Sequence, residues 1–162
     1  IERYGIDRFA ERLAQAGGHG VITPDLTPEE AGPWIAATSA RDLDRIFLVA
    51  PSSTDARISQ VSAVTSGFLY AASTMGVTGA RTTVSSAAPE LVARSRRLTK
   101  LPIAVGLGVS TGAQAADVAA FADGVIVGSA FVRRILQAET PAEATEQVRA
   151  LARDLARGVR GE

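Results

Sequence analysis

The sequence predicts an α/β fold with a buried parallel sheet, because apolar runs of strand length alternate with segments of helical periodicity along the 162 residues. These runs are apolar throughout rather than alternating with polar residues, which is typical of strands covered on both faces. Two of them end in glycine, at 105–110 (VGLGVS) and 125–130 (VIVGSA), one strand–helix unit apart. Paired glycine ends of this kind are typical of loops that hold phosphate.

The predicted elements have recognisable ends. Helical spacing predicts a first helix from Ile6 that ends at Gly17-Gly18. The segments 27–30 (TPEE) and 140–143 (TPAE) each combine an N-cap threonine, a proline and a capping-box glutamate, and they predict helices from Thr27 to about residue 38 and from Thr140 onward. Further helices are expected at 54–64, from 89, at 111–121 and at 130–136, and strands at 20–26, 45–50, 68–73, 103–105 and 124–127.

Composition excludes several functional classes. The 17 basic and 17 acidic residues cancel, and no run approaches 18 apolar residues, so we expect neither a nucleic-acid nor a membrane partner. The absence of cysteine and the presence of a single histidine exclude disulfides, thiolate zinc sites and multi-histidine metal sites. A reducing, cytoplasmic location is expected, with no metal.

Five strand–helix units can be counted, whereas a closed (β/α)8 barrel needs eight units and about 250 residues. A doubly wound sheet could be complete at this length. However, Gly106 and Gly108 are followed by Gly112, one residue too late for a dinucleotide-binding fingerprint, and they lie late in the chain. A partial (β/α)8 TIM barrel is therefore the expected fold, as a single domain over residues 1–162.

Three motifs in order, 70–80 (YAASTMGVTGA), 106–110 (GLGVS) and 128–130 (GSA), resemble those of the tryptophan synthase alpha chain family. The segments 4–6 (YGI) and 24–30 (PDLTPEE) extend the resemblance over essentially the whole chain. It implies a barrel that cleaves indole-3-glycerol phosphate to indole and glyceraldehyde 3-phosphate in tryptophan biosynthesis. It also implies an alpha2-beta2 assembly with a beta chain, which alone carries pyridoxal phosphate. On this basis the chain is strands four to eight, from helix three through helix eight, with the N-terminal units missing.

The resemblance also implies roles for single residues. Tyr70 is expected beside the substrate hydroxyl, and Thr78 is expected on a lid that closes over the site. The phosphate is expected at Gly79, Gly106, Gly108, Gly128 and Ser129, the indole at Leu48 and Leu107 with Leu26 as a further candidate, and the partner interface at Asp25, Glu29 and Glu30.

Each role has a simpler alternative. The glycines could serve only tight turns, Tyr70 could be a core aromatic residue, and Glu29 and Glu30 could be acids that complement a helix dipole. Arg94, Arg96 and Arg97 are expected to form a solvated helix face.

In the family the general acid is a glutamate on strand two, and a partner aspartate follows in the next loop. Both would lie upstream of Ile1, so this lyase fragment is expected to be inactive alone, because the cleavage needs two groups of different pKa. The alternatives are another phosphate-binding barrel enzyme, such as an isomerase or prenyltransferase, and a non-catalytic half barrel that binds phosphate or docks on a partner. Unpaired first and last strands are expected to promote self-association.

Overall fold

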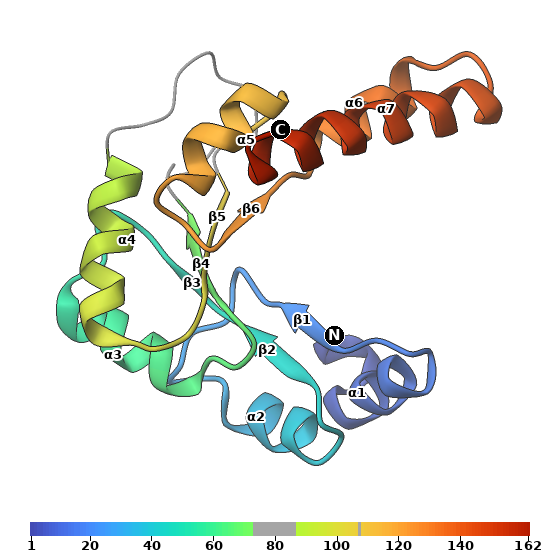
Figure 1. The fold of residues 1–162 in the computed structure, drawn as a ribbon. Coiled ribbons are helices and arrows are strands. Elements are labelled where there is room, and N and C mark those ends of the chain that lie inside the picture. The colour runs from blue at the N-terminus through green and yellow to red at the C-terminus, as the bar shows by residue number, and fades with distance from the viewer. Residues whose placement is uncertain (73–86, 107) are drawn as a thin grey trace.

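Strands and helices alternate along the chain in the computed structural model, which describes residues 1–72, 87–106 and 108–162. In chain order the elements are the 3-10 helix η1 (Glu2–Tyr4), α1 (Ile6–Gln15), β1 (Gly20–Ile22), α2 (Gly32–Ser39), β2 (Asp44–Ile46), β3 (Leu48–Val49), α3 (Asp55–Val64), β4 (Leu69–Ala72), α4 (Ala87–Leu98), β5 (Ile103–Gly106), α5 (Gly112–Ala119), β6 (Gly124–Ile126), α6 (Ser129–Gln137) and α7 (Pro141–Arg160) (Figure 1).

Every described strand pair is parallel. β1 pairs with β2, and β3, β4, β5 and β6 pair in that order. Only Phe47 separates β2 from β3, and its carbonyl oxygen accepts a hydrogen bond from Tyr70 N at 3.1 Å. One stretch of chain therefore contributes to both the two-stranded and the four-stranded sheet, and the strand order across them follows the sequence, as in the predicted partial barrel.

The two faces of this sheet differ in burial. Leu69, Val105 and Ile103 point to one face and are fully buried. This face packs against the helices, since α4 contacts both β4 and β5. Tyr70 and its neighbour in register, Ala104, point to the opposite face, where Tyr70 is only half-buried. Helices thus seal one face of the sheet and leave the other open.

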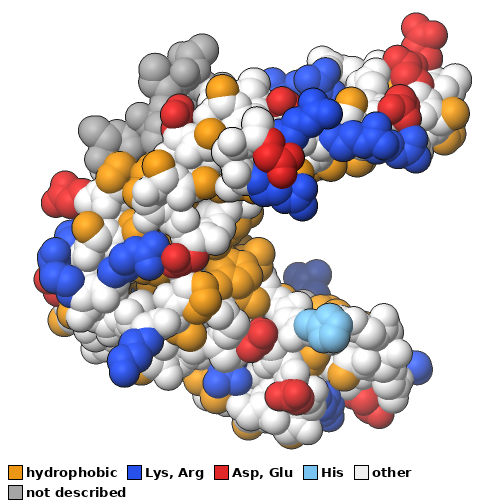
Figure 2. Space-filling view, viewed as in Figure 1, with side chains coloured by type: hydrophobic (Ala, Val, Ile, Leu, Met, Phe, Trp, Pro, Cys, Tyr) orange, Lys and Arg blue, Asp and Glu red, His pale blue; other side chains and the backbone are white. Residues whose placement is uncertain are grey.

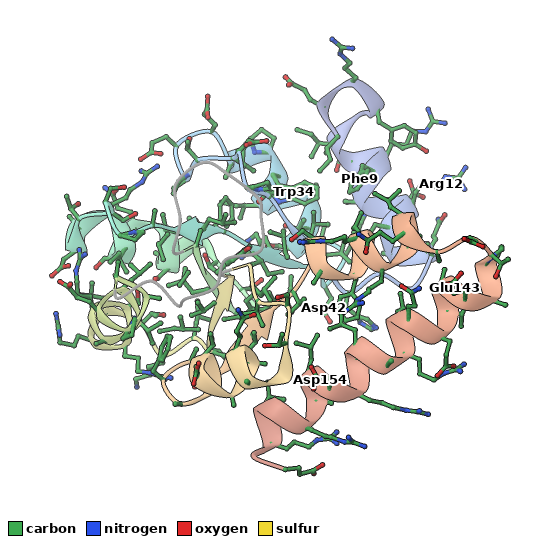
Figure 3. All side chains as sticks on the ribbon, turned by 90° about the horizontal axis from the view of Figure 1, so that it is seen from above. Phe9, Arg12, Trp34, Asp42, Glu143 and Asp154 are labelled. Atoms are coloured by element: carbon green, nitrogen blue, oxygen red, sulfur yellow. The ribbon has the colours of Figure 1, made fainter. Side chains whose placement is uncertain are left out.

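The open face lies inside a curve. β1 with α1 and α2 forms one arm, and the α6–α7 hairpin forms the other (Figure 1). In the lower arm Trp34 of α2 is 3% exposed and packs on Phe9 of α1, with ring centroids 6.1 Å apart (Figure 3). Figure 2 shows a hollow between the arms with hydrophobic side chains at its base. Within the described residues β1 and β6 each pair on one side only, so both sheet edges flank this hollow.

The helix predicted from Thr27 begins five residues later, at Gly32. The expected capping box does not form: Thr27 Oγ1 donates to Glu30 Oε2 at 2.9 Å and Glu30 N donates to the Thr27 carbonyl oxygen, so these residues close a turn ahead of the helix. Pro33 explains the shift: it has no N–H to donate to the carbonyl of Glu29, and its ring would clash there, whereas it fits the first turn of a helix. Glu29 and Glu30 are therefore not residues of the first helical turn.

The expected solvated arginine face is wrong for Arg94, whose side chain is 21% exposed, whereas the side chain of Arg96 is 46% exposed and Arg97 is exposed as well. Arg94 donates to the carbonyl oxygen of Ser53 at 2.6 Å and to Asp55 at 2.8 Å. Arg96 donates to the carbonyl of Phe121 at 3.2 Å and to Asp123 at 2.9 Å. Both side chains tie helix α4 to neighbouring units.

Among the described residues, no helix combines the length and apolar character needed to cross a bilayer.

The Asp123 carboxylate holds the start of β5 in place. It accepts hydrogen bonds from Arg96 and from the backbone N of Ile103, and these lower its pKa. Because a lowered pKa favours the ionised form in the folded state, this stabilisation is present above the ordinary Asp pKa of about 4 and is lost as pH falls through the lower folded value.

We therefore expect Asp123→Asn to reduce stability at pH 7 by about 0.5–1 kcal/mol, a value discounted for solvent screening because the carboxylate is 38% exposed. The loss should shrink at acid pH, where the wild-type carboxylate is protonated. Urea unfolding midpoints measured between neutral and strongly acid pH test this. Asp117→Asn, an exposed carboxylate on α5, is the control, and an equal pH dependence in wild type and Asp123→Asn would contradict the assignment.

Candidate functional site

The open face brings two predicted site residues side by side. Leu48 of β3 and Tyr70 of β4 are partners in register, so their side chains leave the sheet on the same side. Both are half-buried, whereas the flanking Val49 and Leu69 on the other face are buried. An apolar side chain and a phenol therefore lie next to each other on the open face.

Tyr70 packs against Gly106, the last residue of β5. A Cβ at Gly106 would overlap the Tyr70 hydroxyl and would lie 2.7 Å from Tyr70 Cε2. Gly106 is therefore required to make room for the tyrosine, besides any role toward a ligand. Burial raises the pKa of the Tyr70 phenol, so the group stays protonated and able to donate a hydrogen bond at neutral pH. Tyr70 is half-buried and is not among the fully buried side chains of the core.

Residues 108–111, which lead into α5, are held in place by burial and by hydrogen bonds. Gly108 has φ +70°, a conformation that glycine adopts at little cost, and Val109 is buried. Ser110 N donates to Gln114 Oε1 at 2.8 Å, and Thr111 caps α5 by accepting from Gln114 N. The loop therefore enters α5 along a fixed path.

The start of α6 differs from the starts of α3, α5 and α7. Threonine side chains cap those three helices, whereas no side chain in the described part of the chain caps α6. A Cβ at Gly128, the N-cap, would meet no atom within 4 Å, so packing does not demand glycine there. Ser129 follows as the first helical residue. An uncapped helix start with an open glycine and a hydroxyl can accept an anion.

The three acids predicted at a partner interface lie in the exposed segment between β1 and α2. Asp25 is exposed and follows the end of β1. Glu29 accepts a hydrogen bond from Arg57 Nη1 at 2.5 Å, which lowers its pKa. Glu30 is held by Thr27. These contacts order the segment and leave its outer surface exposed.

Three predicted site residues, Thr78, Gly79 and Leu107, lie outside the described residues. Among residues 1–72, 87–106 and 108–162, no three His, Cys, Asp or Glu side chains come close enough to hold a metal ion.

The structure adds one residue that sequence patterns did not single out and changes the role of another. Ile22 ends β1 and is 41% exposed, in register with Ile46 and so on the face that carries Leu48. An exposed isoleucine at the end of a strand gives no separate signal in sequence. Arg94 fixes the loop after β3 through Ser53, a contact between residues 41 apart that no local pattern reveals.

The contact between Gly106 and Tyr70 can be tested by titration. In a Tyr4→Phe background, which leaves one of the two tyrosines, Tyr70 should ionise above the ordinary phenol pKa of about 10. Adding Gly106→Ala should push the ring toward solvent and bring its pKa down, measured by the ultraviolet absorbance of the phenolate. Gly32→Ala, where a Cβ meets open space, is the control. An unchanged phenol pKa in Gly106→Ala would show that the contact does not hold the ring.

Comparison with known proteins agrees with this geometry. A family model described as tryptophan synthase alpha chain matches residues 1–160. The alpha chain of Thermobifida fusca is 59% identical over 99% of this chain and 60% of its own length, and that of Streptomyces coelicolor is 57% identical over 100% and 60%. The chain thus spans about 60% of the length of these curated relatives.

Solved structures agree as well. A structure of Mycobacterium tuberculosis tryptophan synthase superposes with a TM-score of 0.89 at 55% identity, over 99% of this chain and 59% of that one. An alpha2-beta2 tryptophan synthase complex from Pyrococcus furiosus superposes with a TM-score of 0.85 at 32% identity, over 96% and 62%. The partial-barrel fold predicted from the sequence is confirmed, and the chain belongs to the tryptophan synthase alpha chain family.

Proposed function

We propose that these 162 residues form one partial-barrel domain that binds the substrate of the alpha reaction, indole-3-glycerol phosphate. One observation carries the proposal. Leu48, Tyr70 and Gly106 meet on the open face of the sheet, and the glycine-containing segments that follow β5 and β6 leave the carboxyl ends of the same strands. Carboxyl ends of parallel strands are where barrel enzymes place their substrates. The family assignment supplies the identity of the ligand.

Each end of the substrate has a matching group. Leu48 and Ile22 offer apolar surface to the indole ring. Ser129 and the uncapped start of α6 offer hydrogen-bond donors to the phosphate, and Gly128 lets the ligand approach the backbone. Tyr70, kept neutral by its environment, lies between the two groups as a donor toward the glycerol hydroxyls.

Cleavage of the carbon–carbon bond requires that the indole ring carbon gain a proton and that a side-chain hydroxyl lose one. The described face offers the Tyr70 phenol, whose raised pKa makes it a poor base at neutral pH. We infer that this chain orients the substrate, and that the proton-transferring carboxylates belong to the first part of the alpha chain fold.

We also propose that the segment between β1 and α2 docks on a tryptophan synthase beta chain. Asp25, Glu29 and Glu30 are exposed on it, and the segment follows the carboxyl end of β1, the end of the strands where the proposed substrate site lies. The Glu29–Arg57 pair and the Thr27–Glu30 contact limit the segment's freedom before binding, which reduces the entropy lost on association. The alpha2-beta2 composition of the Pyrococcus complex supports a beta chain as the partner.

The phosphate site can be tested with Gly128→Ala. Because the added Cβ meets no protein atom, we expect unchanged thermal stability and about tenfold weaker binding of inorganic phosphate, which corresponds to about 1.4 kcal/mol. Amide NMR titration measures the affinity. Gly32→Ala, also with open space at its Cβ, should leave it unchanged. Equal phosphate affinity in Gly128→Ala and wild type would place the phosphate elsewhere.

Catalysis is tested separately from binding. The purified 162-residue chain should bind indole-3-glycerol phosphate but release no indole from it, with or without a beta chain. Its intact mass is measured first, to establish that the assayed species has the 16.8 kDa of this sequence. Indole release by a chain of that mass would show that its own residues perform the proton transfers, and a failure to bind would favour a docking module without a substrate.

A further inference from the structure

Helix α5 begins at Gly112, and the backbone N–H of this residue is bound by a side chain that lies far away in the sequence. Gly112 N donates a hydrogen bond of 2.6 Å to Asp154 Oδ2, and Asp154 belongs to α7, 42 residues later in the chain. Figure 3 shows Asp154 on the long C-terminal helix where that helix passes α5. The carboxylate therefore sits at the positive end of the α5 dipole.

The two helices approach closely at this point. A Cβ at Gly158 would overlap the Gly112 carbonyl oxygen, and a Cβ at Gly112 would lie 2.8 Å from Asp154 Oδ1. α7 itself is long and well capped, by Thr140 at its start and by Gly161, with φ +71°, at its end. Asp154 thus ties the start of a short helix to a rigid one.

Further donors near the start of α5 also have partners within the protein. Gln114 N donates to Thr111 Oγ1 at 3.3 Å, and Ser110 donates to Gln114 Oε1 from its N at 2.8 Å and from its Oγ at 3.1 Å. An external anion at this helix end would have to displace these acceptors and would be repelled by the carboxylate. α6, which begins after the next strand, carries no side-chain cap among the described residues.

We propose that Asp154 is a positioning residue for the phosphate site. By holding Gly112 it fixes the preceding loop residues Gly108–Ser110, and by filling the α5 end it directs the phosphate to the start of α6. The effect on phosphate rests on the function proposed above, whereas the effect on the loop does not.

The first experiment measures amide hydrogen exchange in the ligand-free chain. In Asp154→Ala we expect exchange at Gly108–Gln114 to rise about tenfold, because the anchor of α5 is lost. Asp154→Asn, whose side-chain carbonyl can accept the same hydrogen bond, should stay within about threefold of wild type. Asp117→Ala, an exposed aspartate within α5, is the control and should change nothing. Unchanged exchange in Asp154→Ala would overturn the proposal.

The second experiment titrates inorganic phosphate into the same variants. Asp154→Ala should bind about fivefold more weakly and Asp154→Asn about as well as wild type. Leu151→Val, a core change in α7, should lower stability but leave the Asp154–Gly112 hydrogen bond in place, and it should keep its affinity. If Asp154→Ala loses no more affinity than Leu151→Val, the positioning role is wrong.

The two experiments separate the proposals. If wild type binds no phosphate while exchange rises only in Asp154→Ala, the phosphate site fails, and Asp154 is established as the residue that positions the loop.

Discussion

The parallel arrangement of the strands is the constraint on which the site depends. Because β1 to β6 all run in one direction, their carboxyl ends and the loops that follow them lie together at one end of the strands. Leu69, Val105 and Ile103 seal the helix-covered face, so their neighbours along each strand must point into the hollow. Leu48, Tyr70 and Gly106 come from separate units and meet there only because of this register. A slip of one residue would turn Tyr70 into the helix-covered face.

Contacts between neighbouring units then fix the loops at that edge. Arg94 reaches from α4 to the carbonyl of Ser53, and Arg57 reaches from α3 to Glu29. The Arg57–Glu29 pair is exposed on the glutamate side, and such pairs contribute little to the free energy of unfolding. Their effect is on geometry. Arg94 holds the loop after β3 to α4, and Arg57 holds the segment after β1 to α3. Arg94 and Arg57 therefore connect neighbouring strand–helix units.

Local patterns predicted most of the fold and part of the site. The order of strands and helices, the Thr140 cap and the glycine ends follow from periodicity, capping chemistry and the residues that turns require. The capping signature at Thr27 predicts too early a start for α2, because Pro33 cannot lie in the interior of a helix and fits only its first turn. The roles of Ile22, Arg94 and Asp154 give no local signal in the sequence, for a different reason. Their partners lie far away in sequence, and only the fold brings them together.

The distribution of roles along the chain has a mechanistic consequence. The proposed phosphate contacts and their supports come from the units β5 to α7, where Asp154 anchors α5 and α6 is left uncapped. The proposed indole wall comes from β1 to β4. The described members of both are held by contacts within these 162 residues, which span about 60% of the relatives' length. Proton transfer is different, because the open face offers a phenol whose raised pKa unsuits it to act as a base. The proposed function therefore places binding and acid–base chemistry in different parts of one barrel.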